Sequence, residues 1–164
     1  MALLATIRFN DLTWGENVIY RDTKKMQGCI YGLRLRVKEQ IPLNTAMFVI
    51  EMNNDKNQVE GVGLIRNFIA TDKYYKVYEN SDFNRYIYKS EYRVSREELM
   101  EINSELVECV ETLCFKGKTH QKRLPGITVM SEKLLATAGT TNGKMAEQIK
   151  EIFMLKFRGE TFLD

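Results

Sequence analysis

The hydrophobic pattern of this chain changes character at Ser95, and that change limits the folds the chain can adopt. Between about residues 28 and 94, apolar residues alternate with polar ones or form short continuous runs, as they do in strands. After Ser95 they recur every three or four positions, as they do on one face of a helix. A strand-dominated middle followed by helices predicts a mixed α+β fold.

Several stretches of the middle region are expected to be strands. Residues 33–38 alternate in hydrophobicity and place Arg34 and Arg36 on one face. The apolar runs 47–50 and 59–65 flank an Asn-rich turn and predict a hairpin. Residues 74–78 and 86–94 are rich in aromatic side chains, which are common in strands.

The clearest helix begins at Ser95, where Ser95 and Glu98 form the sequence pattern of a capping box. An apolar stripe follows, made of Leu99, Ile102, Leu106, Val110 and Leu113. Glutamates fall on the opposite face, so we expect this helix to pack on a sheet or helix and to show an acidic face to water. A short helix capped by Ser131 is expected at 132–135, and a last helix at about 144–157.

Composition excludes several classes of protein. The 164 residues carry 24 Lys and Arg against 22 Asp and Glu, a net charge of +2, which is too small for a nucleic-acid binder that relies on total charge alone. A single histidine, His120, excludes two-histidine zinc sites and histidine-pair phosphotransfer. The chain shows no signal-peptide pattern and no long apolar run, and its three cysteines fit no disulfide framework. We therefore expect one intracellular domain over residues 1–164, without a membrane partner.

The densest basic segment lies directly after the acidic helix. Residues 116–123 hold four full positive charges and no acid, and the candidate ligands for phosphate are Lys116, Lys118, His120, Lys122 and Arg123. Arg34 and Arg36 form a second basic element. The alternative for both is a solvated surface, neutralised in the case of the loop by the nearby glutamates.

Aromatic side chains are the second possible binding feature. The chain has one Trp, Trp14, and eight Tyr, and base stacking on an exposed aromatic ring contributes about 1–3 kcal/mol per base. The alternative is that most of these rings pack across the sheet.

Catalytic and metal sites are poorly supported. Cys109, Cys114 and His120 match no zinc spacing, and a Cys114–His120 nucleophilic pair lacks an orienting third group. No GxxxxGK[ST] or GxGxxG phosphate loop is present, and the acids around residues 51–60 form only a weak nuclease pattern. We expect no metal, no cofactor and no enzymatic activity.

Three segments resemble the PUA-like superfamily, above all its EVE-type domains and the related YTH and ASCH groups. They are residues 41–51, residues 57–65 with their small-residue strand, and residues 115–135, which include Arg123-Leu124-Pro125-Gly126-Ile127-Thr128 before a short helix. The ASCH signature GxKxxExR is absent, and the helix after Ser95 is an addition to a compact EVE core.

The resemblance implies a small curved β-barrel with flanking helices and a pocket for a nucleobase, possibly a modified one. On that basis Trp14 or Tyr31 would stack the base, Asn53 and Asn54 would bind its edge, and the loop at 116–123 would hold phosphates of RNA or DNA. Two alternatives remain open from the sequence. One is a self-associating or protein-binding structural subunit, and the other is an enzyme acting on nucleic acid.

Overall fold

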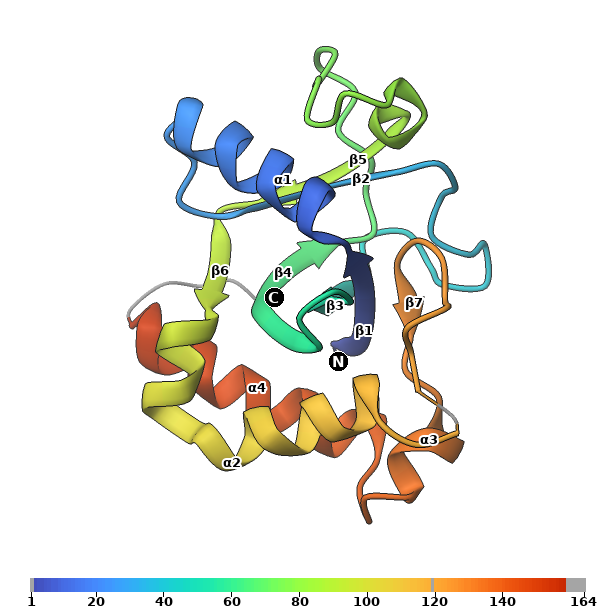
Figure 1. The fold of residues 1–164 in the computed structure, drawn as a ribbon, viewed down its shortest axis with the longest axis vertical. Helices are drawn as coiled ribbons and strands as arrows, with labels where there is room; N and C mark the ends of the chain where they lie inside the picture. The colour runs from blue at the N-terminus through green and yellow to red at the C-terminus, as the bar shows by residue number, and fades with distance from the viewer. Residues whose placement is uncertain (1, 119, 159–164) are drawn as a thin grey trace.

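The computed structural model describes residues 2–118 and 120–158. Two sheets and four α-helices make up this part of the chain (Figure 1). The strands are β1 (Leu3–Phe9), β2 (Cys29–Leu33), β3 (Ala46–Asn53), β4 (Gln58–Arg66), β5 (Tyr86–Ser90), β6 (Tyr92–Ser95) and β7 (Thr128–Val129). The helices are α1 (Asp11–Thr23), α2 (Arg96–Phe115), α3 (Glu132–Ala136) and α4 (Asn142–Lys156), and a 3₁₀ turn, η1, spans Ser81–Asn84.

The main sheet has five strands in the order β6-β4-β3-β1-β7. β1 runs parallel to β3, and the other neighbours are antiparallel. The predicted hairpin of β3 and β4 is confirmed, with Asn57 at φ 53 in its turn. β2 and β5 form a separate two-stranded antiparallel ribbon. Residues up to 27, where no element was predicted, contribute β1, which lies beside the central strand β3, and the helix α1.

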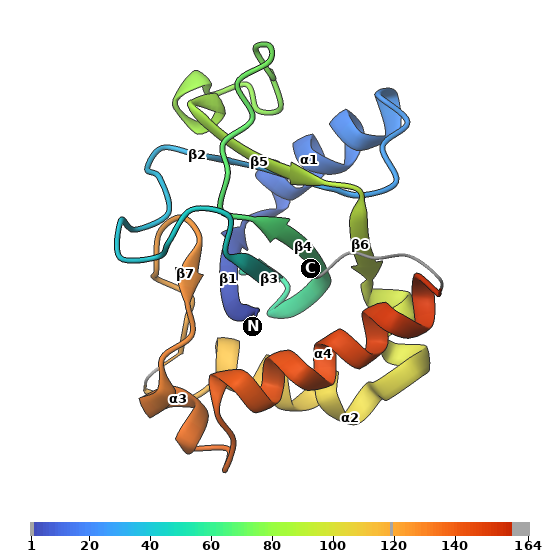
Figure 2. The same cartoon turned by 180° about the vertical axis from the view of Figure 1, so that it is seen from behind.

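The main sheet is covered on both faces. Figures 1 and 2 show α2 and α4 across one face, and the β2–β5 ribbon with α1 across the other. Each face has its own buried apolar cluster, one joining the sheet to the C-terminal helices and one joining it to the ribbon. The fold is thus the predicted α+β class. No ladder joins the two sheets into a closed barrel in the part of the chain that the structure describes.

Local signals in the sequence are confirmed at the helix starts. Ser95 and Glu98 form the capping box of α2, and Ser131 accepts from the backbone N–H of Leu134 at the start of α3. The stripe of the last helix is buried in α4, at Met145, Ile149, Ile152 and Phe153.

Three predictions of local structure are wrong. β2 ends at Leu33, so residues 34–38 are irregular and Leu35 is 64% exposed. Residues 74–78 are also irregular rather than a strand. In α2 the backbone of Asn103 is non-helical (φ −155°, ψ 79°), and its Oδ1 accepts from the N–H of Leu106, which restarts the helix. The kink moves Ile102 out of the predicted stripe, where it is 40% exposed.

Within the described residues, none of the helices is both long and apolar enough to cross a membrane.

Candidate functional site

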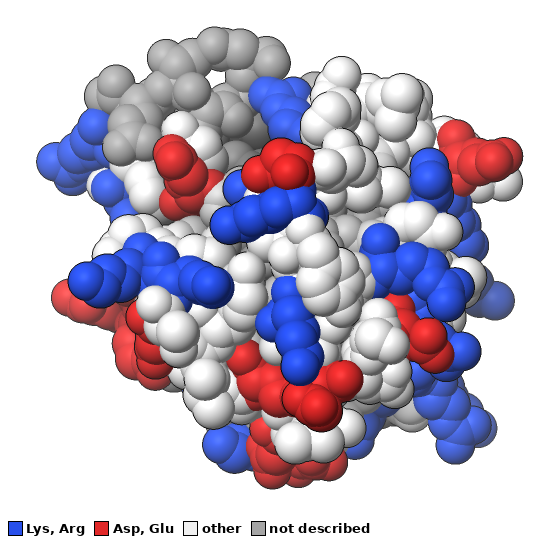
Figure 3. Space-filling view, turned by 90° about the horizontal axis from the view of Figure 1, so that it is seen from above, with Lys and Arg blue, Asp and Glu red and all other residues white. Residues whose placement is uncertain are grey.

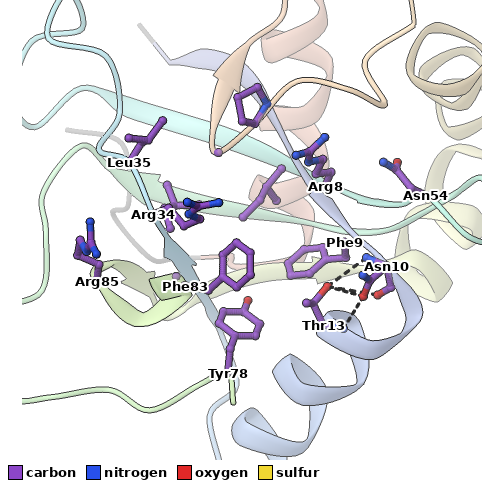
Figure 4. A pocket seen from close by; sticks show the side chains of 15 residues that line it. Arg8, Phe9, Asn10, Thr13, Arg34, Leu35, Asn54, Tyr78, Phe83 and Arg85 are labelled. Atoms are coloured by element: carbon purple, nitrogen blue, oxygen red, sulfur yellow. Dashed lines mark hydrogen bonds between the residues drawn. The ribbon is translucent and has the colours of Figure 1, made fainter. Parts of the chain in front are cut away.

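A pocket of about 650 Å³ opens where the end of β1, the start of α1, the end of β2 and η1 meet. This volume is in the range of ordinary small-molecule sites. Its lining combines apolar side chains, among them Phe9, Leu33 and Phe83, with arginines (Figure 4). A site with an apolar interior and a cationic rim suits a ligand that is flat and apolar in one part and anionic in another.

The arginines at this pocket come from separate elements. Arg8 lies near the end of β1, Arg34 follows β2, and Arg85 follows η1. All are exposed, and within the described residues neither Arg8 nor Arg34 forms an ion pair. Arg85 contacts Asp82 at 3.4 Å in a solvent-exposed pair, a kind that contributes little to stability. Their guanidinium groups therefore remain available to an anion.

The apolar interior depends on close packing between β2 and η1. A Cβ on Gly32 would lie 2.1 Å from the backbone oxygen of Phe83, so only glycine lets the turn approach the strand this closely. Phe83 in turn meets Tyr78 edge to face, with ring centroids 6.3 Å apart. The hydroxyl of Tyr78 accepts from Asn17 Nδ2, which fixes the ring from the α1 side. Burial raises the pKa of Tyr78, so the phenol is neutral near pH 7.

The start of α1 supplies polar side chains to the same pocket. Asn10 and Thr13 line it and form a reciprocal capping box, in which Asn10 Oδ1 accepts from the N–H of Thr13. Figure 4 shows these bonds beside the ring of Phe9. The two side chains are thus held in place before any ligand arrives.

The basic segment after α2 is attached to the rim of the pocket. Asn54 lines the pocket and donates from Nδ2 to the backbone oxygen of Lys122 at 2.8 Å. Pro125 and Gly126, a few residues further on, also line the pocket. Asn54 Oδ1 is buried and has no hydrogen-bond partner within the described residues, so one acceptor at this rim is unused.

The residues of the basic segment differ in exposure. Lys116, Lys118 and Arg123 are exposed, whereas His120 and Lys122 are partly buried. The ring nitrogen Nδ1 of His120 accepts from the N–H of Lys122 at 3.3 Å, a local contact that shapes the turn. The structure thus places Arg34 and Asn54 in the lining of one pocket. The basic segment is joined to this lining through the backbone oxygen of Lys122, and its charged side chains are not part of the lining.

The structure places Tyr31 and Asn53, the residues predicted for a base pocket, in the interior and not in the lining of this pocket. Both residues are 0% exposed. Tyr31 donates from its hydroxyl to Glu51 Oε2 at 2.6 Å inside the core between the ribbon and the main sheet, and burial raises its pKa. Asn53 uses its Oδ1 to accept from the N–H groups of Asp55 and Lys56, which closes the β3–β4 turn.

Trp14 packs inward instead of presenting a free face. Arg21 and Arg93 both lie over its ring, at 5.2 and 5.6 Å from the centroid, and Phe9 meets it edge to face. It is not among the residues that line the pocket. In this arrangement Trp14 does not present its ring to the pocket, as stacking of a base there would require. It contacts Phe9, which does line the pocket.

Arg36 and the cysteines lie away from the pocket lining. Arg36 is exposed and lies over the ring of Tyr86, with 5.0 Å between Cζ and the ring centroid. Cys29 and Cys114 are buried, and Cys109 is partly buried. The described residues contain no cluster of three or more His, Cys, Asp or Glu side chains suited to a metal ion.

The pocket's aromatic wall and two of its arginines were missed from the sequence. Arg8 is the charged residue of Leu3–Phe9, in which the other residues except Thr6 are apolar, and a strand end is where such a residue fits. Arg85 and Phe83 follow the turn signal at residues 80–82. No sequence signal joins these three residues, because the pocket forms only when β2, η1 and β1 meet in space.

The face above α1 and the ribbon is not uniformly basic. Figure 3 shows lysines and arginines interspersed with acidic side chains across that face. Binding of an anionic polymer there would depend on local groups such as the pocket's arginines and not on a broad positive field.

Searches of family models, of curated proteins and of solved structures find no match to this chain.

Proposed function

We propose that this chain is a non-enzymatic nucleic-acid-binding module of PUA-like architecture. In this proposal a nucleobase enters the pocket between β1, β2 and η1, and the flanking phosphates bind the pocket's arginines and the basic segment 116–123. The observation that carries it is the combination, in one pocket, of Phe9 and Phe83 with Arg8 and Arg34, which form no ion pair with any described residue.

The two kinds of group match the two parts of a nucleotide. A base is flat and largely apolar on its faces, and aromatic or apolar contacts stabilise it once it leaves its stack. Guanidinium groups bind phosphate oxygens through two parallel N–H donors, which a lysine does not do. A purely apolar ligand would leave the arginines unused, and a small inorganic anion would leave the apolar wall unused.

The basic segment extends the same surface. The bond from Asn54 to the oxygen of Lys122 holds the segment against the pocket, so a strand whose base occupies the pocket passes close to the lysines. The PUA-like part of the proposal rests on the curved sheet, the ribbon above it and the buried cluster between them. It also rests on the resemblance of residues 41–51, 57–65 and 115–135.

Fluorescence polarisation with labelled single-stranded RNA, single-stranded DNA and duplex DNA tests the proposal. Replacing four cations of the segment by Ala is expected to weaken binding of every sequence and to flatten the salt dependence, measured at about 50 and 200 mM salt. These cations are Lys116, Lys118, Lys122 and Arg123.

A control with the same change in net charge replaces four lysines outside the pocket and the segment. These are Lys24, Lys25, Lys144 and Lys150. The control is expected to keep most of the affinity and the salt slope of the wild-type protein. Equal losses in the two variants would remove the segment from the binding surface, and the lack of binding to all three nucleic acids at low salt would contradict the proposal.

A second candidate, self-association or protein binding, is favoured by one observation. Leu12 and Ile19 are 71% and 67% exposed and lie two turns apart on α1, hence on the same face. Size-exclusion chromatography with light scattering separates the two functions. A stable oligomer that dissociates on changing both residues to Ser, together with no affinity for nucleic acid, would favour the second candidate.

A further inference from the structure

At the end of β1, the edge that faces away from β3 has no partner strand among the described residues, and this end lines the pocket. On one side β1 pairs with β3 along its whole length, from Leu3 to Phe9. On the other side β7 pairs only with Ala5 and Thr6. The last residues of β1 therefore have no partner strand on the β7 side within the described residues, and Ile7, Arg8 and Phe9 all line the pocket.

The direction of the backbone groups at this edge follows from the bonds around it. The backbone oxygen of Phe9 accepts from the N–H of Asn54 on the β3 side, whereas the oxygen of Leu4 accepts from Met130 on the β7 side. Successive residues of a strand direct their N–H and C=O groups to alternate sides. Arg8 therefore directs both its N–H and its C=O to the β7 side, in line with Leu4.

A glycine stops β7 before it can cover these groups. Thr6 pairs with Thr128, so the continued antiparallel register would place Gly126 opposite Arg8. Gly126 has φ +62°, a left-handed conformation that a strand does not contain, and the ladder ends before it. Both Gly126 and Arg8 line the pocket. The gap between them leaves a backbone donor and a backbone acceptor side by side at the pocket wall.

We propose that the backbone N–H and C=O of Arg8 bind the Watson–Crick edge of an unpaired nucleobase in this pocket. The inference rests on the proposed function and names its ligand class more narrowly. All four bases carry a donor next to an acceptor on this edge, so each can form two bonds with one residue of a strand, as a neighbouring strand does. The pocket would then select bases whose pairing edge is free, with little regard to which base it is.

The pocket's lining supports reading by the backbone. Apart from the arginines, which the proposed function assigns to phosphate, three of its polar side chains are committed to other contacts: Asn10 and Thr13 cap α1, and the hydroxyl of Tyr78 accepts from Asn17. The buried Oδ1 of Asn54 is an additional acceptor at the rim. A fully paired duplex has its Watson–Crick edges occupied, so it would enter the pocket only by flipping a base out of its stack.

Uniformly modified oligouridines test the inference by polarisation. A methyl group at N3 removes the donor and blocks the Watson–Crick edge, whereas a methyl group at C5 leaves this edge free. Oligo(3-methyluridine) is expected to bind at least about tenfold more weakly than oligouridine, and oligo(5-methyluridine) within about threefold of it. Equal binding of the two methylated oligomers, with strong binding of oligouridine, would overturn this inference and leave nucleic-acid binding intact. No binding of plain oligouridine, single-stranded DNA or duplex DNA would overturn the proposed function itself.

Two substitutions at Arg8 test the same contact from the protein side. Arg8→Ala removes the guanidinium and keeps the backbone N–H, whereas Arg8→Pro removes both. Proline is tolerated at a strand position whose N–H points away from the ladder. Arg8→Ala is expected to bind more weakly but to keep the preference for oligouridine over oligo(3-methyluridine), and Arg8→Pro is expected to lose most of that preference. An unchanged preference in a folded Arg8→Pro variant would contradict the inference, as would the loss of the preference in Arg8→Ala. If Arg8→Pro does not fold, as judged by circular dichroism, the ligand series on Arg8→Ala decides.

Discussion

The two faces of the main sheet are buried by different means. On the face covered by α2 and α4, the interior is almost entirely apolar, with Phe48 and Phe153 in ring contact at 5.0 Å. On the face covered by the β2–β5 ribbon and α1, the interior also contains a charged pair. Glu51 of β3 accepts three hydrogen bonds from Nε and Nη2 of Arg93 and one from the hydroxyl of Tyr31.

This difference determines which face of the sheet holds the pocket in shape. An apolar interface tolerates small shifts, because dispersion and burial have no preferred direction. Hydrogen bonds and ion pairs fix orientation, and here they connect β2, β3 and β6 at the base of the ribbon that carries Gly32 and Arg34 to the pocket. The polar contacts of the ribbon face therefore hold the pocket's geometry and also stabilise the chain, whereas the helix face contributes to stability without shaping the pocket.

The largest expected loss of stability comes from removing one partner of the Glu51–Arg93 pair. Glu51 is 1% exposed, and its removal leaves the Arg93 guanidinium, itself only 11% exposed, without its carboxylate. Burial acts to lower the pKa of Arg93, but the carboxylate of Glu51 raises it, so the arginine stays charged. Glu51→Ala is expected to lower the free energy of unfolding by about 3–5 kcal/mol, measured by urea denaturation.

Replacing both partners together sharpens this prediction. Glu51→Leu with Arg93→Met removes both charges at similar volume, so it is expected to restore at least about half of the lost stability. A Glu51→Ala variant as stable as the wild-type protein would show that the pair does not hold this face together.

An intermediate change in stability is expected at alkaline pH, and it comes again from a residue on the ribbon face. Burial raises the pKa of the Cys29 thiol from 9.0 to about 11. Because the pKa is raised in the folded state, the neutral Cys29 thiol contributes fully to the free energy of unfolding below pH 9. This contribution is lost as the pH rises through about 11. When the pH is raised from about 8.5 to 10.5, the free energy of unfolding is expected to fall in both proteins. The fall is expected to be about 2 kcal/mol smaller in Cys29→Ala than in the wild-type protein. The same loss in both proteins would assign the alkaline sensitivity to other groups.

A smaller effect is expected on the helix face for a change that keeps the interface apolar. Phe153 is fully buried against Phe48. Phe153→Leu removes only part of the ring and is expected to cost about 1–1.5 kcal/mol in urea denaturation. It should leave nucleic-acid affinity unchanged within about twofold, since α4 does not line the pocket. A loss of affinity comparable to that of a pocket variant would contradict the separation of the two faces.

Local features of the fold could be predicted from the sequence, and non-local ones could not. The caps at Ser95 and Ser131 and the β3–β4 hairpin depend on residues a few positions apart, and all are confirmed. The parallel pairing of β1 with β3 joins segments about 44 positions apart, as in Leu3 with Met47, and no pattern in either segment specifies it.

The candidate site shows the same limit more sharply. Arg34, Asn54 and the basic segment were identified by residue type, and the structure places Arg34 and Asn54 in the pocket lining. Tyr31 was misplaced because its hydroxyl partner, Glu51, lies on another strand, and a buried tyrosine with a partner looks like an exposed one in sequence. Arg8 was missed because its importance depends on where β7 ends.

The measurement that tests the central claim most directly compares two neighbouring arginines. Arg34 lines the pocket, whereas Arg36, two residues further on, is also exposed but lies over Tyr86 outside the lining. Affinity for labelled single-stranded RNA is measured by polarisation at about 50 and 200 mM salt for Arg34→Glu and Arg36→Glu. The account predicts that Arg34→Glu weakens binding at least about tenfold and Arg36→Glu by no more than about threefold. Equal losses in the two variants, or no binding by the wild-type protein at low salt, would contradict it.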